Sequence, residues 1–247
     1  MMTVTRALRP PPLMEPPIKV GGLVEPVTDK DIGLMINEVR ADRPSGISGW
    51  DLAELHFFMR GIGRAEKIEK NDLQKMKNFL SDARTGNDGW QTAGMLFLMH
   101  GIGYALQVTP DDVEWMQKRL LEIRSRGSGW QIASLHNHMH GIGHGERVTP
   151  DDIGMMRRGV EDARSQNKCF DLILINSFLH SIGQGTQVTG ADITMMKREL
   201  EDARLARYVG DGRRLARTHY LMRKLAAHMV TGEQLHVPAI KTWGGPQ

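Results

Sequence analysis

A repeat of 40 residues runs through most of this chain and constrains its fold more than any other feature. Four sets of marker residues recur at that interval. They are Gly49-Trp50, Gly89-Trp90, Gly129-Trp130 and Cys169-Phe170; the segments 60–63, 100–103, 140–143 and 180–183, which read Gly-Ile-Gly or Ser-Ile-Gly; the Val-Thr segments at 108–112, 148–152 and 188–192; and Arg84, Arg124, Arg164 and Arg204. Weaker echoes of the Val-Thr marker stand at 68–72 and, one residue out of step, at 27–31. Four markers that agree on one period predict a chain built from repeated structural units.

Each repeat unit is predicted to contain two helices. The first begins at a Thr-Pro-Asp-Asp sequence such as 149–152, because threonine suits the N-cap, proline the first helical position and aspartate the positive end of the helix dipole. Its apolar residues recur at helical spacing: Ile153, Met156, Val160 and Ala163. The second helix starts near Trp130, and its apolar stripe is Ile132, Leu135, Met139 and Ile142. Trp130, Ala133 and Gly141 fall on the opposite side of this helix, which predicts a helix buried between neighbours.

The expected fold class is all-α, an α-solenoid of about four and a half helix–turn–helix repeats. A single hairpin cannot bury two apolar faces, so the units must stack on one another. In the fifth unit the markers drift, and Arg213 to Met229 is interpreted as a diverged, basic C-terminal cap. The period and the helix pairs resemble the α-solenoid superclass, in which HEAT and armadillo repeats are nearest in length. That resemblance implies a fold and not a particular function.

Three segments follow from these patterns. Residues 1–26 hold six prolines and are expected to form an extended tail, with Arg6 and Arg9 as a faint sign of organelle targeting. Residues 27–230 form the repeat domain, with units near 27–67, 68–107, 108–147, 148–187 and 188–230. Residues 231–247 form a C-terminal tail. No apolar stretch is long enough to cross a bilayer, and a single cysteine, Cys169, permits a reducing compartment, so an intracellular location, cytoplasmic or mitochondrial, is expected.

The recurring marker residues have structural and functional interpretations. The tryptophans and Phe170 are interpreted as a buried aromatic ladder, with base stacking as the alternative. The Gly-Ile-Gly segments are expected to end the second helix, with close approach of a neighbouring backbone as the alternative. The recurring arginines are expected to bridge to acidic helix starts or to cap carbonyls, and a ladder for phosphates is the alternative.

Residues at the positions equivalent to 131, 134 and 138 lie outside both apolar faces and differ between units. Variable residues on a repeated frame are typical of ligand contacts, although they could instead pack against the neighbouring helix. The predicted partner-binding residues are Glu54, Phe58, Leu98, Ser134, His138, Leu174 and Phe178.

Positive charge is concentrated near the C-terminus. The three central units are close to neutral, whereas residues 188–247 carry ten basic and six acidic side chains, which predicts a patch for an acidic protein, a lipid surface or nucleic acid. The residues of this predicted basic patch are Arg198, Arg204, Arg207, Arg213, Arg214, Arg217, Arg223 and Lys224.

Catalysis and metal binding find little support in the sequence. His136, His140 and His144 lie at four-residue intervals and could present three imidazoles on one helical face, but His140 occupies the register that also holds His100 and His180. Packing or hydrogen bonding is therefore favoured over a metal site. No nucleophile–base pair, paired carboxylates or phosphate loop is recognised, so no catalytic residue, metal or cofactor is predicted.

The sequence therefore predicts a non-enzymatic scaffold that binds protein partners, such as a structural subunit of an organellar or ribonucleoprotein assembly. A neutral repeat surface argues against a phosphate-binding stripe, which would have to be positive. The alternative is an RNA- or DNA-binding helical-repeat protein that uses its basic C-terminal region.

Overall fold

The structure is a computed structural model that describes residues 24–40, 47–205 and 211–231, without the side chains of the last three residues. All of its regular structure is helical, and no strand occurs in these ranges. The described helices are α1 (Asp29–Arg40), α2 (Gly49–Gly61), α3 (Lys70–Thr85), α4 (Gly89–Gly101), α5 (Pro110–Arg126), α6 (Gly129–Gly141), α7 (Pro150–Ser165), α8 (Cys169–Ser181), α9 (Gly190–Leu205) and α10 (Asp211–Thr231). The predicted all-α fold is confirmed, while the two predicted tails fall mostly outside these ranges.

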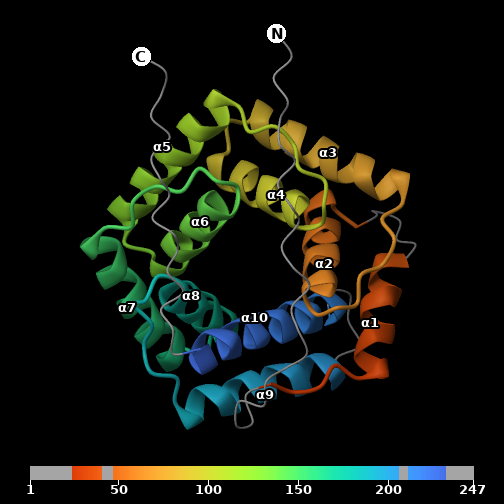
Figure 1. The fold of residues 1–247 in the computed structure, drawn as a ribbon, viewed down its shortest axis with the longest axis vertical. Helices are drawn as coiled ribbons and strands as arrows, with labels where there is room; N and C mark the ends of the chain where they lie inside the picture. The colour runs from red at the N-terminus through yellow and green to blue at the C-terminus, as the bar shows by residue number, and fades with distance from the viewer. Residues whose placement is uncertain (1–23, 41–46, 206–210, 232–247) are drawn as a thin grey trace.

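The helical pairs are arranged around a centre, with the odd-numbered helices outside and the even-numbered helices inside (Figure 1). Each inner helix packs against both helices of the next unit, the inner one and the outer one. The same two contacts join α10 to α2 and to α1, so the last unit packs against the first. The array is therefore a closed ring of five helical pairs.

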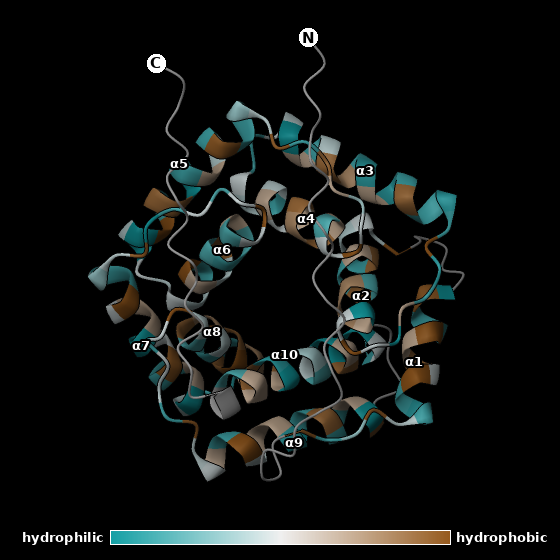
Figure 2. Ribbon diagram, in the orientation of Figure 1, coloured by the Kyte–Doolittle hydropathy of each residue, from teal (hydrophilic) through white to brown (hydrophobic). Residues whose placement is uncertain are grey.

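The outer helices begin as the sequence predicts. The side chain of Thr149 accepts a hydrogen bond from the backbone N–H of Asp152, whose carboxylate accepts one from the N–H of Thr149, which completes a capping box before α7. Thr109 and Asp112 make the same pair before α5. Hydrophilic and hydrophobic residues alternate along each outer helix (Figure 2), as in helices with one face on the core and one in solvent.

The glycine of each Gly-Trp marker permits close contact between helices. At Gly89 an added Cβ would lie 2.2 Å from the carbonyl oxygen of Trp115 in α5, and Gly49 and Gly129 approach α3 and α7 almost as closely. Side chains cannot occupy such positions without displacing backbone. The second glycine of Gly-Ile-Gly has another role, since Gly103 and its counterparts adopt positive φ after the helix, which confirms that this segment ends it.

The recurring arginines bridge one unit to the next, as one of the two interpretations predicted. Arg124 binds the buried carboxylate of Asp152 through Nε and Nη2, at 2.8 and 2.7 Å, and also donates to the carbonyl of Arg147. Arg84 and Arg164 make equivalent pairs 28 residues ahead, with Asp112 and Asp192. Each arginine therefore joins the end of one outer helix to the start of the next.

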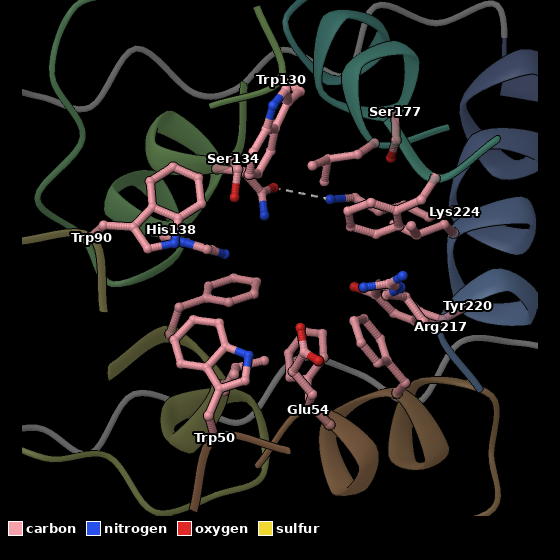
Figure 3. A pocket seen from close by; sticks show the side chains of 18 of the residues that line it. Trp50, Glu54, Trp90, Trp130, Ser134, His138, Ser177, Arg217, Tyr220 and Lys224 are labelled. Carbon is pink, nitrogen blue, oxygen red and sulfur yellow. Dashed lines mark hydrogen bonds between the residues drawn. The ribbon is translucent and has the colours of Figure 1, made fainter. Parts of the chain in front are cut away.

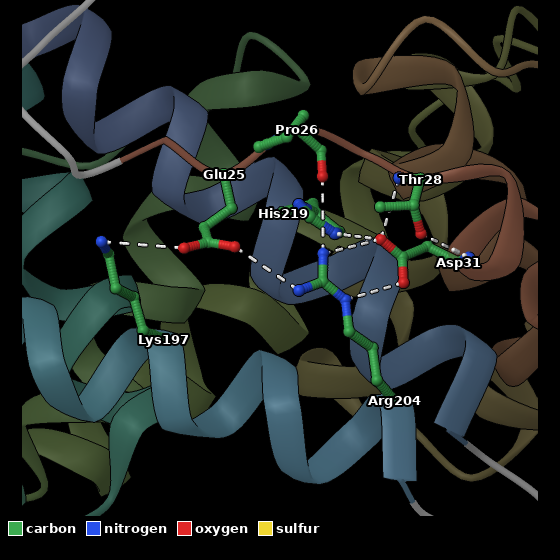
Figure 4. Close-up of polar contacts among 7 residues, drawn as sticks. All are labelled: Glu25, Pro26, Thr28, Asp31, Lys197, Arg204 and His219. Carbon is green, nitrogen blue, oxygen red and sulfur yellow. Dashed lines mark hydrogen bonds and ion pairs between the residues drawn. The ribbon is translucent and has the colours of Figure 1, made fainter.

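The fourth arginine makes the same contact across the closure of the ring (Figure 4). Arg204 at the end of α9 binds both carboxylate oxygens of Asp31, at 2.9 Å each and 173 residues away, and Asp31 is fully buried. His219 of α10 and the backbone N–H of Thr28 also bind Asp31. Burial by itself would raise the pKa of Asp31, but Arg204 and Thr28 lower it to about 2.

The interpretation of the last helix as an end cap is therefore wrong. Gly212 of α10 approaches α1 as the Gly-Trp glycines approach their outer helices, since an added Cβ would lie 2.6 Å from the carbonyl oxygen of Leu34. Leu215, Leu221 and Leu225 of α10 are buried in the continuous core. The helix is apolar enough on several sides to be covered by α1, α2, α8 and α9, and so it completes a ring instead of ending an open array.

Candidate functional site

A cavity of about 450 Å³ lies at the centre of the ring. All five inner helices contribute to its wall, and the outer helix α3 adds Phe79. Its volume falls within the range of about 300–1,000 Å³ that is usual for small-molecule sites. The closed ring thus produces an internal site that belongs to no single repeat unit.

Most of the wall comes from positions that recur in the inner helices. Each set of equivalent positions is called a register and is named by its residue in α6. The register of Trp130 also holds Trp50, Trp90 and Phe170. The register of Ser134 holds the cavity residues Glu54, Leu174 and, by the alignment of Gly212 with Gly129, Arg217. The registers of Asn137 and His138 supply Phe57, Phe97, Ser177, Tyr220, Phe58, Leu98 and Leu221.

Six of the seven residues predicted to bind a partner line this cavity: Glu54, Phe58, Leu98, Ser134, His138 and Leu174. The seventh, Phe178, is buried, and its ring stacks on that of His136 at 6.0 Å. The variable register therefore converges on the centre of the ring. A binding role for these residues stays a prediction.

The sequence analysis did not name Asn137 and its counterparts, and it placed Lys224 in a basic patch instead of a cavity wall. Asn137 and its counterparts lie seven residues after the tryptophan, a spacing that continues the same helical face, and this periodicity could have identified them. Lys224 stands in the register of Gly141, where the other inner helices end, and the alignment of α10 with the repeat is too weak in sequence to reveal this. Figure 3 shows Lys224 and Arg217 projecting from α10 toward the cavity.

Aromatic rings form much of the wall. Trp90 meets Trp130 edge-on, with ring centroids 5.4 Å apart, and lies 6.0 Å from His138. Phe57 packs on Tyr220 at 5.3 Å and on Phe97 at 5.0 Å. The tryptophans are half-buried against the core, because one side of each ring packs on protein while the other faces the cavity. Such a wall suits an apolar or aromatic ligand.

Apart from His138, the acidic and basic side chains of the cavity lining are those of Glu54, Arg217 and Lys224. Burial raises the pKa of Glu54, and its carboxylate lies 3.4 Å from Nη1 of Arg213. Arg217 stacks its guanidinium on the ring of Phe170, 3.6 Å from the centroid, and burial lowers its pKa. Burial likewise lowers the pKa of Lys224 to about 8.

Several polar atoms at the cavity have no hydrogen-bond partner among the described residues. They include Nδ1 of His138, Oγ of Ser177 and Nε of Arg217. Burial lowers the pKa of His138 to about 3, so its imidazole is neutral at physiological pH. Buried polar groups are normally satisfied in folded proteins. The three atoms are themselves buried behind the cavity surface, as are unpartnered atoms in other parts of the core such as those of His56 and Thr92.

The predicted basic patch does not form one surface. Arg204 binds Asp31, Arg214 binds Glu199, and Arg213 contacts Asp51 and Glu54. Arg223 donates to the carbonyl of Ile62, while Arg217 and Lys224 face the cavity. Arg198 lies on the exposed face of α9, and Arg207 lies outside the described residues. The patch is dispersed because α10 is surrounded by other helices and its basic residues point in several directions.

The histidines of α6 have separate surroundings. His136 Nε2 donates to the carboxylate of Asp152 at 3.2 Å, and His140 Nε2 donates to the carbonyl of Glu146 at 3.1 Å. His144 is exposed beyond the helix. Within the described ranges no group of three or more His, Cys, Asp or Glu side chains is placed to hold a metal ion. Cys169 is buried, which raises the pKa of its thiol to about 12.

Comparisons with family models, with curated proteins and with solved structures found no match to this chain. Within the part of the chain that the structure describes, no helix is both long and apolar enough to cross a bilayer. The function must therefore be argued from the central cavity.

Proposed function

We propose that this protein is a non-enzymatic binding protein that holds one small organic molecule in the cavity at the centre of its ring. The observation that carries this proposal is the convergence of aromatic rings and of the basic side chains of Arg217 and Lys224 on one central cavity. Core packing favours apolar residues in well-filled space, so a cavity of this size with buried charges costs stability. A ligand that fills it and satisfies its polar atoms would offset that cost.

The wall also supports specific recognition. Leu98 and Leu174 offer apolar surface, whereas Asn137 and Lys224 offer polar groups. Ligand sites commonly combine a mostly apolar lining with a few polar groups that set the ligand's orientation. Because the residues differ from unit to unit, the wall is asymmetric although the ring is repetitive.

An uncharged fluorescent probe tests the proposal. N-phenyl-naphthylamine is expected to bind the wild type saturably with one site per chain, because its rings fit an aromatic-lined cavity. Leu174→Trp fills part of that cavity and should weaken binding at least about tenfold, which corresponds to about 1.4 kcal/mol. Titration with direct excitation of the probe measures the dissociation constants of the wild type and of Leu174→Trp.

A matched control uses the same substitution on the outer surface. Leu121 lies on α5 with its side chain 63% exposed, so Leu121→Trp should leave probe affinity unchanged. Circular dichroism must show that both variants are folded. Absence of saturable binding by the wild type, or equal affinity for the two tryptophan variants, would show that the cavity is not a binding site.

A protein-binding scaffold is the second candidate, and the exposure of Leu121 favours it. Six of the seven residues first expected to contact a partner line the central cavity, and the seventh, Phe178, is buried. A scaffold would therefore use the outer helices, where Leu121 of α5 and Leu205 of α9 are large apolar residues exposed to solvent.

Affinity capture from the native source distinguishes the two candidates. If the scaffold proposal holds, Leu121→Asp is expected to reduce the amount of co-purifying protein at least about tenfold, whereas Leu174→Trp should leave that amount unchanged. Recovery of the wild type only as a free monomer in size-exclusion chromatography would count against the scaffold. The nucleic-acid alternative has less support, because most of the basic side chains are paired or face the cavity.

A further inference from the structure

Lys224 enters the cavity because α10 continues past the point where the other inner helices end. Its register holds Gly61, Gly101 and Gly141 in α2, α4 and α6. At Gly101 an added Cβ would lie 2.3 Å from the ring of Phe57, so an aromatic neighbour excludes any side chain there. The inner helix before α10 in the ring is α8. It has Ser177 in place of that aromatic residue, which leaves space for a long side chain at position 224.

The ammonium group of Lys224 has no carboxylate partner among the described residues. Within the same ranges its ammonium group donates one hydrogen bond, to the neutral amide oxygen of Asn137 at 3.1 Å. From α6 the ammonium group also faces the uncharged imidazole of His138. Burial lowers the pKa of Lys224 itself to about 8. Lysine is rarely placed in such surroundings without a counter-ion.

The single carboxylate of the cavity wall is already engaged. Glu54 accepts a hydrogen bond from Trp50, pairs with Arg213 and lies close to Arg217. Arg217 is seven residues before Lys224, two turns along the same face of α10, and its Nε is unpartnered. With two basic side chains and one acidic side chain, the wall has an excess of basic groups.

Resting on the function proposed above, we infer that the ligand is an organic monoanion whose carboxylate or similar oxyanion binds Lys224 and whose apolar or aromatic body lies against the tryptophan side of the cavity. The oxyanion supplies the missing counter-ion, and charge-assisted hydrogen bonds of this kind are short and strong in a site of low dielectric constant. Asn137 holds the amine in place, and Arg217 supplies a second basic side chain to the same wall (Figure 3).

Two probes that differ by one charge test the inference. Anilinonaphthalene sulfonate has the rings of N-phenyl-naphthylamine plus a sulfonate, so the ratio of their affinities isolates the contribution of the anion. The wild type should bind the sulfonate at least tenfold more tightly than the neutral probe. Lys224→Met should abolish that preference, so that the ratio of the two affinities falls to about 1. Lys118→Met, at an exposed position on α5, should behave as the wild type.

The outcomes separate this inference from the function on which it rests. If the neutral probe binds in the cavity but the sulfonate has no advantage, or if Lys224→Met keeps the advantage, the inference is overturned and the binding function stands. If neither probe binds the wild type, both are overturned. Lys224→Gln, which keeps a hydrogen-bond donor without the charge, should lose the sulfonate preference too, and retention of the preference there would assign it to hydrogen bonding instead of charge.

Discussion

Asp31→Ala is expected to lower the free energy of unfolding by about 3–5 kcal/mol, although Asp31 lies near the start of the described chain and its main partner lies 173 residues away. The substitution leaves the Arg204 guanidinium and the imidazole of His219 without their shared acceptor, and it removes the cap on the N–H of Thr28. The buried groups would then be desolvated without compensation. Urea denaturation followed by tryptophan fluorescence measures the loss.

An equivalent pair inside the array provides the control. Asp152 is buried in the same way and binds Arg124, His136 and Thr149, so Asp152→Ala should cost about as much as Asp31→Ala. If the ring were open in solution, Asp31→Ala would cost less than about 1 kcal/mol, because an exposed ion pair contributes little. A double-mutant cycle with Arg204→Ala should give a coupling energy of about 2 kcal/mol, and a value near zero would contradict closure.

The same pair predicts how the ring responds to acid. The pKa of Asp31 is lowered to about 2 in the folded protein from the ordinary value of 3.8. Its stabilising contribution is therefore complete above pH 4 and is lost as the pH falls from about 4 to 2. The free energy of unfolding of the wild type should fall over this interval. The difference in that free energy between the wild type and Asp31→Ala should become smaller over the same interval.

Lys224→Met is expected to raise the free energy of unfolding by about 2 kcal/mol at pH 7, in contrast to most substitutions of half-buried residues. Burial lowers the pKa of Lys224 from 10.5 to about 8, and at about 1.4 kcal/mol for each pKa unit the charged form destabilises the fold by roughly 3 kcal/mol. Loss of the hydrogen bond to Asn137 offsets about 1 kcal/mol of the gain. Methionine fills nearly the same volume without a charge.

The pH dependence identifies the source of this gain. The folded protein releases the Lys224 proton near pH 8, whereas the unfolded chain keeps it until about 10.5. The destabilisation is therefore complete below pH 8 and disappears as the pH rises toward 10.5, so the advantage of Lys224→Met should vanish over that interval. Lys118→Met, at an exposed position, should stay within about 0.5 kcal/mol of the wild type at every pH. A destabilised Lys224→Met variant would mean that the lysine is paired within the protein.

A lysine that destabilises the free protein and strengthens the binding of an anion is evidence of selection for function. Stability and affinity are expected to change in opposite directions in Lys224→Met, and a purely structural residue would not show this combination. The two measurements are independent, since one uses unfolding and the other a probe titration. Together they decide whether the cavity is a site or a packing defect.

The sequence by itself determined the helical pairs. The Thr-Pro-Asp-Asp starts, the glycines that end or contact helices, and the 28-residue link from Arg124 to Asp152 are local or depend on adjacent units. Capping, turn formation and ion pairing of this kind can be predicted from the sequence of one unit or of two adjacent units. The periodicity also identified most of the variable residues that line the cavity, because a helical face can be computed from spacing alone.

Only the tertiary structure decided that the array closes, and closure created the site. The curvature of a helical array accumulates from small rotations between units, which no residue pattern within one unit encodes. Consequently the contacts of Asp31 with Arg204 and of Gly212 with Leu34 could not be predicted from the sequence, and neither could the inward position of Lys224. The apparent basic patch was misjudged for the same reason: charges close in sequence on α10 are separated in space by the helices that surround them.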